Sequence, residues 1–277
     1  MRVDHSCEGQ VSARQTFSSE RVMWITPDRV FYVGLLGVPS TRNIGAISLY
    51  IGLDSPVSIS IDGGEWQAGR MAVVQPYTNH RVACDARHIA LIQVEPETVD
   101  VANLPSLLRH ASGLADDEAF VARVRQCHKA LVSDQSRRTA SMAEFDALVF
   151  GERLPTRTMD SRIVQVLECI RNNPSGQALA KDCAEQVHLS FSRFLHLFKS
   201  EVGNSFRSFR TWKRARSLLH YVVDTSTSLT DVALGAGYPD STHFSHSIRQ
   251  VYGLKPRDIF AGSRKLRVIG VKSQPFL

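Results

Sequence analysis

A helix-turn-helix pattern that occurs twice constrains this chain of 277 residues more than any other feature. The second copy, Ser228 to Gly253, predicts a short helix, a turn at Gly237 and a second helix capped by Asp240. Glycine suits this turn because it adopts the left-handed backbone conformation at little cost. Two short helices joined in this way, with a polar outer face on the second, are typical of a unit whose second helix enters a DNA major groove.

The first copy, Ala178 to Gly203, has the same order of elements, with its turn at Val187 to Leu189 and Ser190 as the cap of its second helix. The second helices of the two copies align at an offset of 50 residues, as Phe194 and Phe244 illustrate. The first helices align at an offset of 49, so the second turn is expected to hold one additional residue. A repeated unit of this kind arises by chance much less often than a single copy.

The segment between the two units, Ser205 to Asp224, predicts one linker helix with an apolar face and a basic remainder. Its apolar residues recur at helical spacing: Phe206, Phe209, Trp212, Leu219 and Val222. At about 1.5 Å per residue this helix would span ~28 Å, close to the ~34 Å of one DNA turn. The two second helices are therefore expected to enter successive major-groove segments from one side.

The stretch from Asp160 to about Phe260 resembles the DNA-binding domain of the AraC/XylS family of bacterial transcription regulators. The residues that carry the resemblance are Phe198-Lys199, Gly203, Ala215, Leu218-Leu219, Gly237-Tyr238, Phe244-Ser245, Gly253 and Pro256. The departures from the family pattern are Thr211 where arginine is usual, Ile259-Phe260 in place of Tyr-Arg, and His196 and His246 at positions that are often arginine. The resemblance implies an activator that binds double-stranded promoter DNA as a homodimer and contacts RNA polymerase. A cytoplasmic location is expected, because the first residues show no signal-peptide pattern.

Residues of the second helices that do not belong to the apolar faces are the candidates for DNA contact. In the first unit they are Ser190, Ser192, Arg193, Leu195, His196 and Lys199. In the second unit they are Ser241, Thr242, Ser245, His246 and Arg249. The short side chains of the second unit favour positioning and shape readout over base discrimination.

The uneven distribution of charge supports this assignment. The net charge is +6, yet residues 159–277 hold 17 Lys and Arg against 9 Asp and Glu, whereas residues 1–158 hold 16 against 18. The excess positive charge thus lies in the half with the repeated unit, as binding of phosphates requires.

The first hundred residues predict a β-domain, because short apolar strands alternate with Gly and Asp turns. The stretch from Gly69 to Val82 resembles the second half of a cupin motif, and many AraC-type regulators carry such a domain as a sensor. The candidate lining of a small-molecule effector pocket is Tyr50, Trp66, Gln75, His80 and Arg81. No metal site and no cofactor are expected, since the strand before Gly69 contains no histidine. A cupin-like enzyme fused to a DNA-binding domain is the alternative.

The fold expected for the whole chain is a multidomain α+β arrangement. A cupin-like β-barrel over 1–100 is followed by a helical segment over 101–150, a linker over 151–158, an all-α DNA-binding domain over 159–262 and a basic tail over 263–277. The apolar stripe of Phe120, Val124, Cys127 and Leu131 either pairs two subunits or packs on the barrel. The tail is expected to be a loose extension that binds phosphates. No apolar run is long enough for a membrane span, and no membrane partner is expected.

Overall fold

The computed structural model describes residues 20–134, 141–173, 176, 179–219, 229–252, 255–256 and 266–270. Several expectations lie outside these described residues. They concern the segment 1–19, Val222, the start of the second unit at Ser228, Gly253, Ile259-Phe260, and residues 263–265 and 271–277 of the tail.

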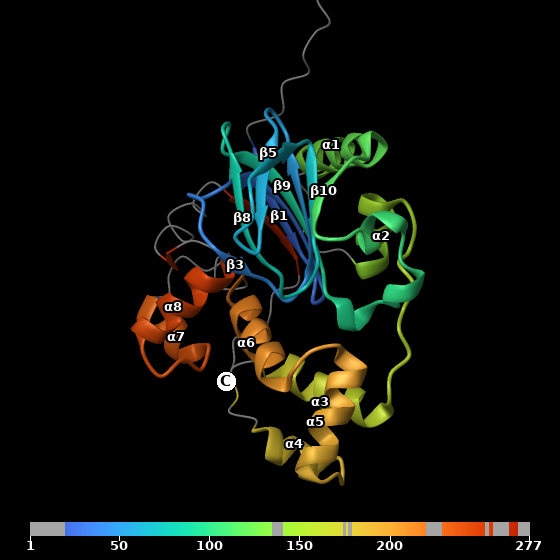
Figure 1. Cartoon of the computed structure of the whole chain (residues 1–277), viewed down its shortest axis with the longest axis vertical. Coiled ribbons are helices and arrows are strands. Elements are labelled where there is room, and N and C mark those ends of the chain that lie inside the picture. Colours follow the sequence, from blue (N-terminus) through green and yellow to red (C-terminus); the bar gives the residue numbers. More distant parts are fainter. Residues whose placement is uncertain are drawn as a thin grey trace, which may run out of the picture.

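Two β-sheets pack face to face in the N-terminal half and form a barrel-like domain (Figure 1). The larger sheet contains, in spatial order, β10 (Gly113–Ala115), β7 (Met71–Val74), β4 (Ile47–Gly52), β9 (His88–Val94), β2 (Arg29–Leu35), β1 (Arg21–Ile25) and β11 (Leu266–Gly270). The smaller sheet contains β3 (Arg42–Asn43), β8 (Asn79–Cys84), β5 (Val57–Ile61) and β6 (Gln67–Gly69). Residues of both sheets form one apolar interior, so the β-domain expected from the sequence is confirmed.

The burial of each strand follows from what covers its faces. In β8 buried residues alternate with more exposed ones, because only one face of this strand is covered. Every residue of β4 is buried, since its sheet has the barrel interior on one face and helices on the other. These helices are α1 (Glu118–Ser133), capped by Asp117, and α2 (Met142–Phe150), capped by Ser141.

The apolar stripe of α1 packs on the sheet. Phe120, Val124, Cys127 and Leu131 are all buried in the core that α1 and α2 share with the larger sheet. This stripe is therefore not a face for a second subunit, and the argument for dimerisation that rested on it is wrong. Before α1 the chain forms the short 3-10 turns η1 (Pro96–Thr98), η2 (Val101–Asn103) and η3 (Ser106–Arg109) instead of a long helix.

The C-terminal half is helical and lies below the barrel in Figure 1. Its helices are α3 (Ser161–Asn172), α4 (Ala180–Gln186), α5 (Phe191–Val202), α6 (Phe206–Ser217), α7 (Leu229–Gly235) and α8 (Ser241–Tyr252). The α-helix of the linker, α6, ends at Ser217 and is followed by a 3-10 turn at Leu218 and Leu219, so it is shorter than the sequence predicts; residues 220–224 lie outside the described part of the chain. Its α-helical part of 12 residues spans ~18 Å rather than ~28 Å.

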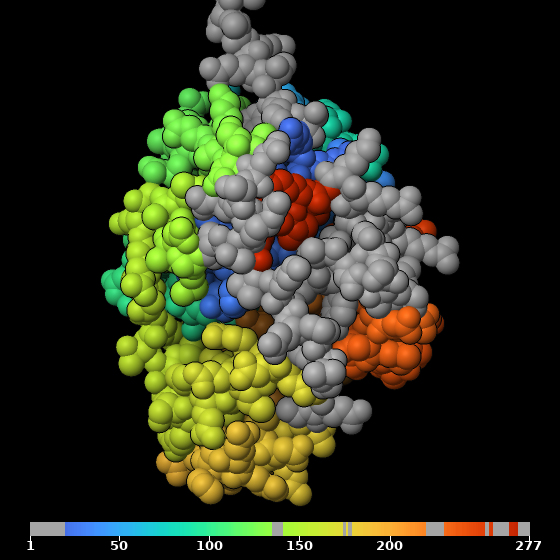
Figure 2. All heavy atoms as spheres, turned by 180° about the vertical axis from the view of Figure 1, so that it is seen from behind, coloured from blue at the N-terminus to red at the C-terminus, as the bar shows by residue number. Residues whose placement is uncertain are grey.

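The tail returns to the N-terminal half. Leu266–Gly270 forms β11, which pairs in parallel with β1 at the edge of the larger sheet. In Figure 2 the red residues of β11 lie beside blue residues of the N-terminal half. Arg267 donates hydrogen bonds to the carbonyl oxygens of Leu131 and Asp134 at the end of α1. The expectation of a loose phosphate-binding tail is therefore wrong for this segment. Its backbone forms the hydrogen bonds of a strand with β1, which would otherwise be the edge of the larger sheet.

Candidate nucleic-acid interface

The turns of the two helical units share one hydrogen-bond pattern. In the first unit His188 adopts φ +55°, and the Leu189 amide donates to the Ala184 carbonyl over 2.9 Å. In the second unit Gly237 adopts φ +73°, and the Tyr238 amide donates to the Ala233 carbonyl over 3.0 Å. The repeat inferred from the sequence is thus confirmed in three dimensions. The additional residue of the second unit falls after Tyr238, just before α8.

The first unit presents a polar face on α5, which we call its reading helix. Phe194, Phe198 and Val202 are buried in a core shared with α3 and α4. The candidate DNA-contacting residues lie on the other side. Exposed are Ser190, Ser192, Arg193, His196 and Lys199, whereas Leu195 is half-buried. The Ser190 hydroxyl caps the helix by accepting a hydrogen bond from the Arg193 amide, which limits its availability for DNA.

The second unit presents a comparable face on its reading helix, α8. Phe244 and Ile248 are buried against α7 and Tyr238. The candidate contacts Ser241, Thr242, His246 and Arg249 are exposed, and Ser245 is half-buried. The cap of α8 differs from that of α5, because it is a carboxylate. The Asp240 side chain accepts hydrogen bonds from the Thr242 and His243 amides, both over 2.8 Å, and these bonds lower the pKa of Asp240. A negative charge therefore stands at the N-terminal end of α8, beside the candidate contacts Ser241 and Thr242.

Helix α6 joins the two units. At its N-terminal end Phe206 and Phe209 make edge-on ring contacts with Phe198 of the first unit, at centroid distances of 5.2 Å and 5.5 Å. At its C-terminal end Leu218 lies in the core of the second unit. The Tyr252 hydroxyl of α8 donates to the Ala215 carbonyl over 2.9 Å. The two units are thus held to one helix by packing at both ends.

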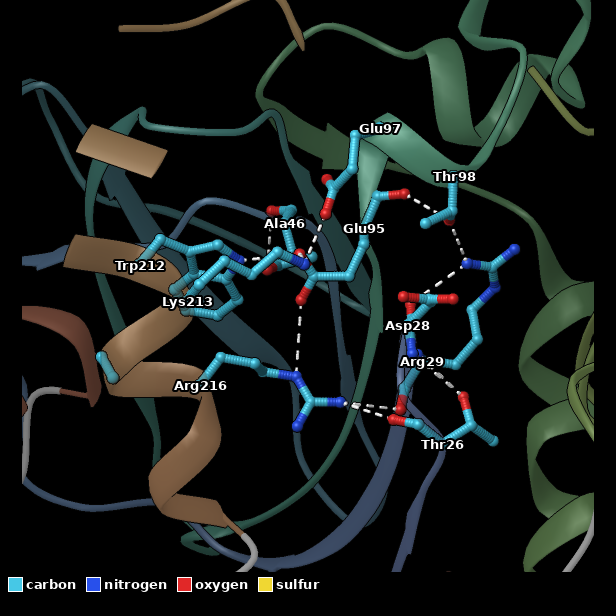
Figure 3. A network of polar contacts seen from close by, with 12 residues as sticks. Thr26, Asp28, Arg29, Ala46, Glu95, Glu97, Thr98, Trp212, Lys213 and Arg216 are labelled. Carbon is cyan, nitrogen blue, oxygen red and sulfur yellow. Dashed lines mark hydrogen bonds and ion pairs between the residues drawn. The ribbon is translucent and has the colours of Figure 1, made fainter. Parts of the chain in front are cut away.

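The middle of α6 contacts the barrel through a buried polar network (Figure 3). One carboxylate oxygen of Glu95 accepts hydrogen bonds from Trp212 Nε1 over 2.8 Å and from Lys213 Nζ over 2.9 Å. Lys213 also forms an ion pair with Glu97. Arg216 Nε lies 3.4 Å from the second Glu95 oxygen. We call Glu95, Glu97, Trp212, Lys213 and Arg216 the interdomain network.

Because the charged groups of the interdomain network are buried, each of them changes the pKa of its neighbours. The Lys213 side chain is 14% exposed, and those of Glu95 and Glu97 are 2% and 4% exposed. Burial and the charge of Glu95 raise the pKa of Glu97, while Lys213 opposes this rise. Burial alone would lower the pKa of Lys213, but the two carboxylates outweigh it and the pKa is raised. Lys213 therefore stays charged, and it is the shared cation of two buried acids.

Apolar contacts surround the interdomain network. Trp212 packs with Ile44 of the barrel and with Val251 of α8. Leu219 packs with strands β1 and β2. Both residues of the apolar face of the linker helix therefore contact the N-terminal half as well as the second unit.

The comparisons with known proteins agree with this geometry. Residues 183–262 match a family model described as a helix-turn-helix domain. Over 103 residues the chain is 27% identical to the HTH-type transcriptional activator RhaS of Klebsiella pneumoniae, a region that covers 37% of each protein. Over 76 residues it is 32% identical to the invasion protein InvF of Salmonella typhimurium, covering 27% of this chain and 35% of InvF. The chain thus spans 37% or less of the length of these relatives.

The C-terminal half carries an AraC-type helix-turn-helix domain. The resemblance inferred from its motifs is confirmed. The AraC-type domain and the barrel together also match a known fold, since ToxT of Vibrio cholerae O395 superposes with a TM-score of 0.55 at 9% identity, over 86% of this chain and 98% of ToxT. The expected α+β arrangement is thereby confirmed as a fold.

Two of the five residues proposed to line an effector pocket lie outside the barrel, and the side chain of a third, Gln75, binds a loop. Trp66 is 42% exposed and stacks under the exposed Arg81 guanidinium at 4.9 Å, outside the barrel. The Gln75 side chain donates to the carbonyl oxygens of Leu108 and His110 and so fastens a loop. Trp66 and Arg81 are therefore not pocket residues.

Tyr50 and His80, in contrast, do meet inside the barrel. The Tyr50 hydroxyl lies 2.9 Å from His80 Nε2, and both residues are buried. Beside them lies Arg42, which is opposite His80 in the pairing of β3 with β8 and was not among the candidates. Among the described residues there is no group of three or more His, Cys, Asp or Glu that could hold a metal ion, and no described helix is long and apolar enough to cross a membrane.

Proposed function

We propose that this chain is a sequence-specific DNA-binding regulator of transcription, and that it acts in the cytoplasm as an activator. The observation that supports this best is the pair of reading helices. Each buries its apolar face in a core of its own and exposes polar and basic residues, and α6 holds both units. Homodimerisation on promoter DNA, contact with RNA polymerase and control by a small-molecule effector belong to the same proposal. The match to transcriptional activators over the AraC-type domain supports it.

Selection of bound sites from random duplex DNA by the full chain is expected to yield a defined sequence. If about five phosphates are contacted, the plot of log affinity against log salt concentration should have a slope of about −4 to −5. The basic residues exposed on α5 and α8 are the physical reason for this dependence. A folded protein whose selected sites share no sequence, or whose binding does not weaken with salt, would contradict the proposal.

The first reading helix is expected to contribute more to specificity than the second. Arg193→Ala or His196→Ala should each weaken binding to the selected site by about 1–3 kcal/mol, the usual cost of a lost base contact. Ser241→Ala and Ser245→Ala should cost less, because their side chains are short and Asp240 places a negative charge beside them. Binding isotherms of the four variants on one duplex test this ranking.

The control for this ranking is an exposed residue of the first unit that lies outside its reading helix. Gln186→Ala changes an exposed residue on α4, outside the reading helix, and should leave affinity unchanged. Thermal unfolding of each variant checks that the fold is retained. The ranking is wrong if the α8 variants lose more affinity than the α5 variants while unfolding at the same temperature.

A further inference from the structure

A buried hydrogen-bonded chain crosses the interior of the barrel and connects its two sheets. Tyr50 comes from β4 in the larger sheet, and His80 comes from β8 in the smaller one. The Tyr50 hydroxyl lies 2.9 Å from His80 Nε2, while His80 Nδ1 lies 2.9 Å from the Thr78 carbonyl oxygen. Tyr50 is 0% exposed and His80 is 1% exposed.

The position of each proton in this series of hydrogen bonds follows from which atoms can only accept. The Thr78 carbonyl can only accept, so Nδ1 of His80 carries a proton and donates. Burial, aided by the charge of Arg42, lowers the pKa of His80 to about 4, although the Thr78 carbonyl and Asp62 oppose this shift. The ring is therefore neutral near pH 7, Nε2 accepts, and the Tyr50 hydroxyl donates to it. The lone pairs of the hydroxyl oxygen remain available to a donor.

Arg42 lies at this hydroxyl and carries the charge of the cluster. It stands opposite His80 in the pairing of β3 with β8, and it is 4% exposed. Its positive charge acts on Tyr50 and opposes the rise in the pKa of that hydroxyl that burial causes. Its Nε is buried without a hydrogen-bond partner, and within the described part of the chain no carboxylate forms an ion pair with it.

This situation is costly for a protein. A charge is rarely buried unless it is paired and hydrogen-bonded, because removal from water is expensive. The other buried arginines of this barrel interface follow that rule: Arg29 pairs with Asp146 over 3.0 Å, and Arg216 pairs with Glu95 over 3.4 Å. Arg42 differs from both, since no carboxylate in the described part of the chain forms an ion pair with it, and the charge of Arg42 acts on the neutral Tyr50 hydroxyl.

We propose that Arg42, together with Tyr50, binds the carboxylate of a small monoanionic ligand inside the barrel. The planar guanidinium presents paired donors that match the geometry of a carboxylate. One negative charge neutralises one cation, whereas a phosphate monoester brings about −1.5 to −2 charges at pH 7. The surrounding residues are apolar, among them Val57, Ile59 and Val82, so excess charge would be left without compensation.

The position of Arg42 connects this site to the AraC-type domain. Strand β3 ends at Asn43, and the next residue, Ile44, packs against Trp212 of α6 and Val251 of α8. A ligand at Arg42 would thus act on a strand two residues away from the interface with the second reading helix. The ligand proposed here would be the small-molecule effector of the proposed function. Only its effect on DNA binding rests on that function, because binding of the ligand itself is measured without DNA.

The test measures thermal unfolding of the full chain with acetate, butyrate, octanoate and palmitate, each beside its uncharged methyl ester. At least one carboxylate is expected to raise the unfolding temperature in a saturable manner, as binding to the folded state requires. Its ester, sodium chloride at equal ionic strength and inorganic phosphate are expected to have no such effect. A wild-type protein that none of the carboxylates stabilises beyond sodium chloride overturns the proposal, as does equal stabilisation by phosphate.

Two variants separate a ligand site from a structural role. Arg42→Met removes the buried charge, so without ligand it should unfold at a temperature no lower than the wild type, and it should lose the carboxylate effect. Arg42→Lys keeps the charge but loses the paired donors, and its affinity should fall at least about tenfold. The matched control Arg81→Met changes the exposed arginine that follows His80 and should behave as the wild type. A carboxylate effect that persists in Arg42→Met, or an Arg42→Met protein that does not fold, overturns the proposal.

Discussion

Replacing Lys213 with methionine is expected to lower the free energy of unfolding of the full chain by about 3–5 kcal/mol. The reason is that Glu95 and Glu97 would remain buried after their shared cation is removed. Neither carboxylate has access to water that could replace the lost ion pair, since the exposed fractions of their side chains are 2% and 4%. Chemical denaturation followed by circular dichroism measures the effect.

A second variant shows whether the loss of stability in Lys213→Met comes from the unpaired buried charge. In the double variant Lys213→Met and Glu97→Gln, both charges of that ion pair are absent while Glu95 keeps Arg216 as its partner, so most of the lost stability should return. The matched control is Lys181→Met, which breaks an ion pair with Glu185 on the surface of α4, where Lys181 is 74% exposed. This exposed pair should cost less than about 1 kcal/mol. Equal losses for Lys213→Met and Lys181→Met would show that the interdomain network does not hold the two halves together.

The helical units were predictable from the sequence because their determinants are local. The cap at Ser190 and its reading helix, or Gly237 with Asp240, lie within a few residues of the backbone groups that they satisfy. The apolar stripe of each reading helix also predicts which side faces the core. Periodicity and caps therefore sufficed to place Arg193 and His196 on an exposed surface.

The interface between the halves was not predictable, because its partners are far apart in the chain. Trp212 and Glu95 are separated by 117 residues, and a lone Trp on an amphipathic helix equally predicts a contact within the helical domain. The pairing of β11 with β1 joins strands from opposite ends of the sequence. The one available signal was Arg216, which is spaced to lie beside both Trp212 and Lys213 on the helix, together with the two acids Glu95 and Glu97 that follow β9.

The candidate ligand site shows a different limit. Tyr50 and His80 were selected because inward positions of strands line a barrel, and they do lie inside. Trp66 was selected in the same way, but it lies in the connection between β5 and β6 and is 42% exposed. Arg42 was missed because the two-residue strand β3 has no periodicity from which its inward direction could be read.

Insertion of one alanine after Lys213 is expected to reduce affinity for the selected DNA site by about three orders of magnitude or more, down to non-specific binding. The insertion rotates the chain after it by about 100° and moves it about 1.5 Å along the axis of α6. Leu218, which anchors the second unit, would then no longer face the same side as Phe209, which anchors the first. The residual binding should be insensitive to sequence and sensitive to salt.

The controls for this insertion separate the loss of phase from a general disturbance of the fold. An alanine inserted after Gly63, whose surroundings are open in the turn between β5 and β6, should leave DNA affinity unchanged. Deleting Ser217 from the insertion mutant brings Leu218 back into phase with the first part of α6, so it should restore part of the specific affinity. Full recovery is not expected, because Arg216 would still be displaced from Glu95 and from the Thr26 and Arg29 carbonyl oxygens. If the insertion mutant keeps both its helix content by circular dichroism and wild-type specificity, then α6 does not set the relation between the two reading helices.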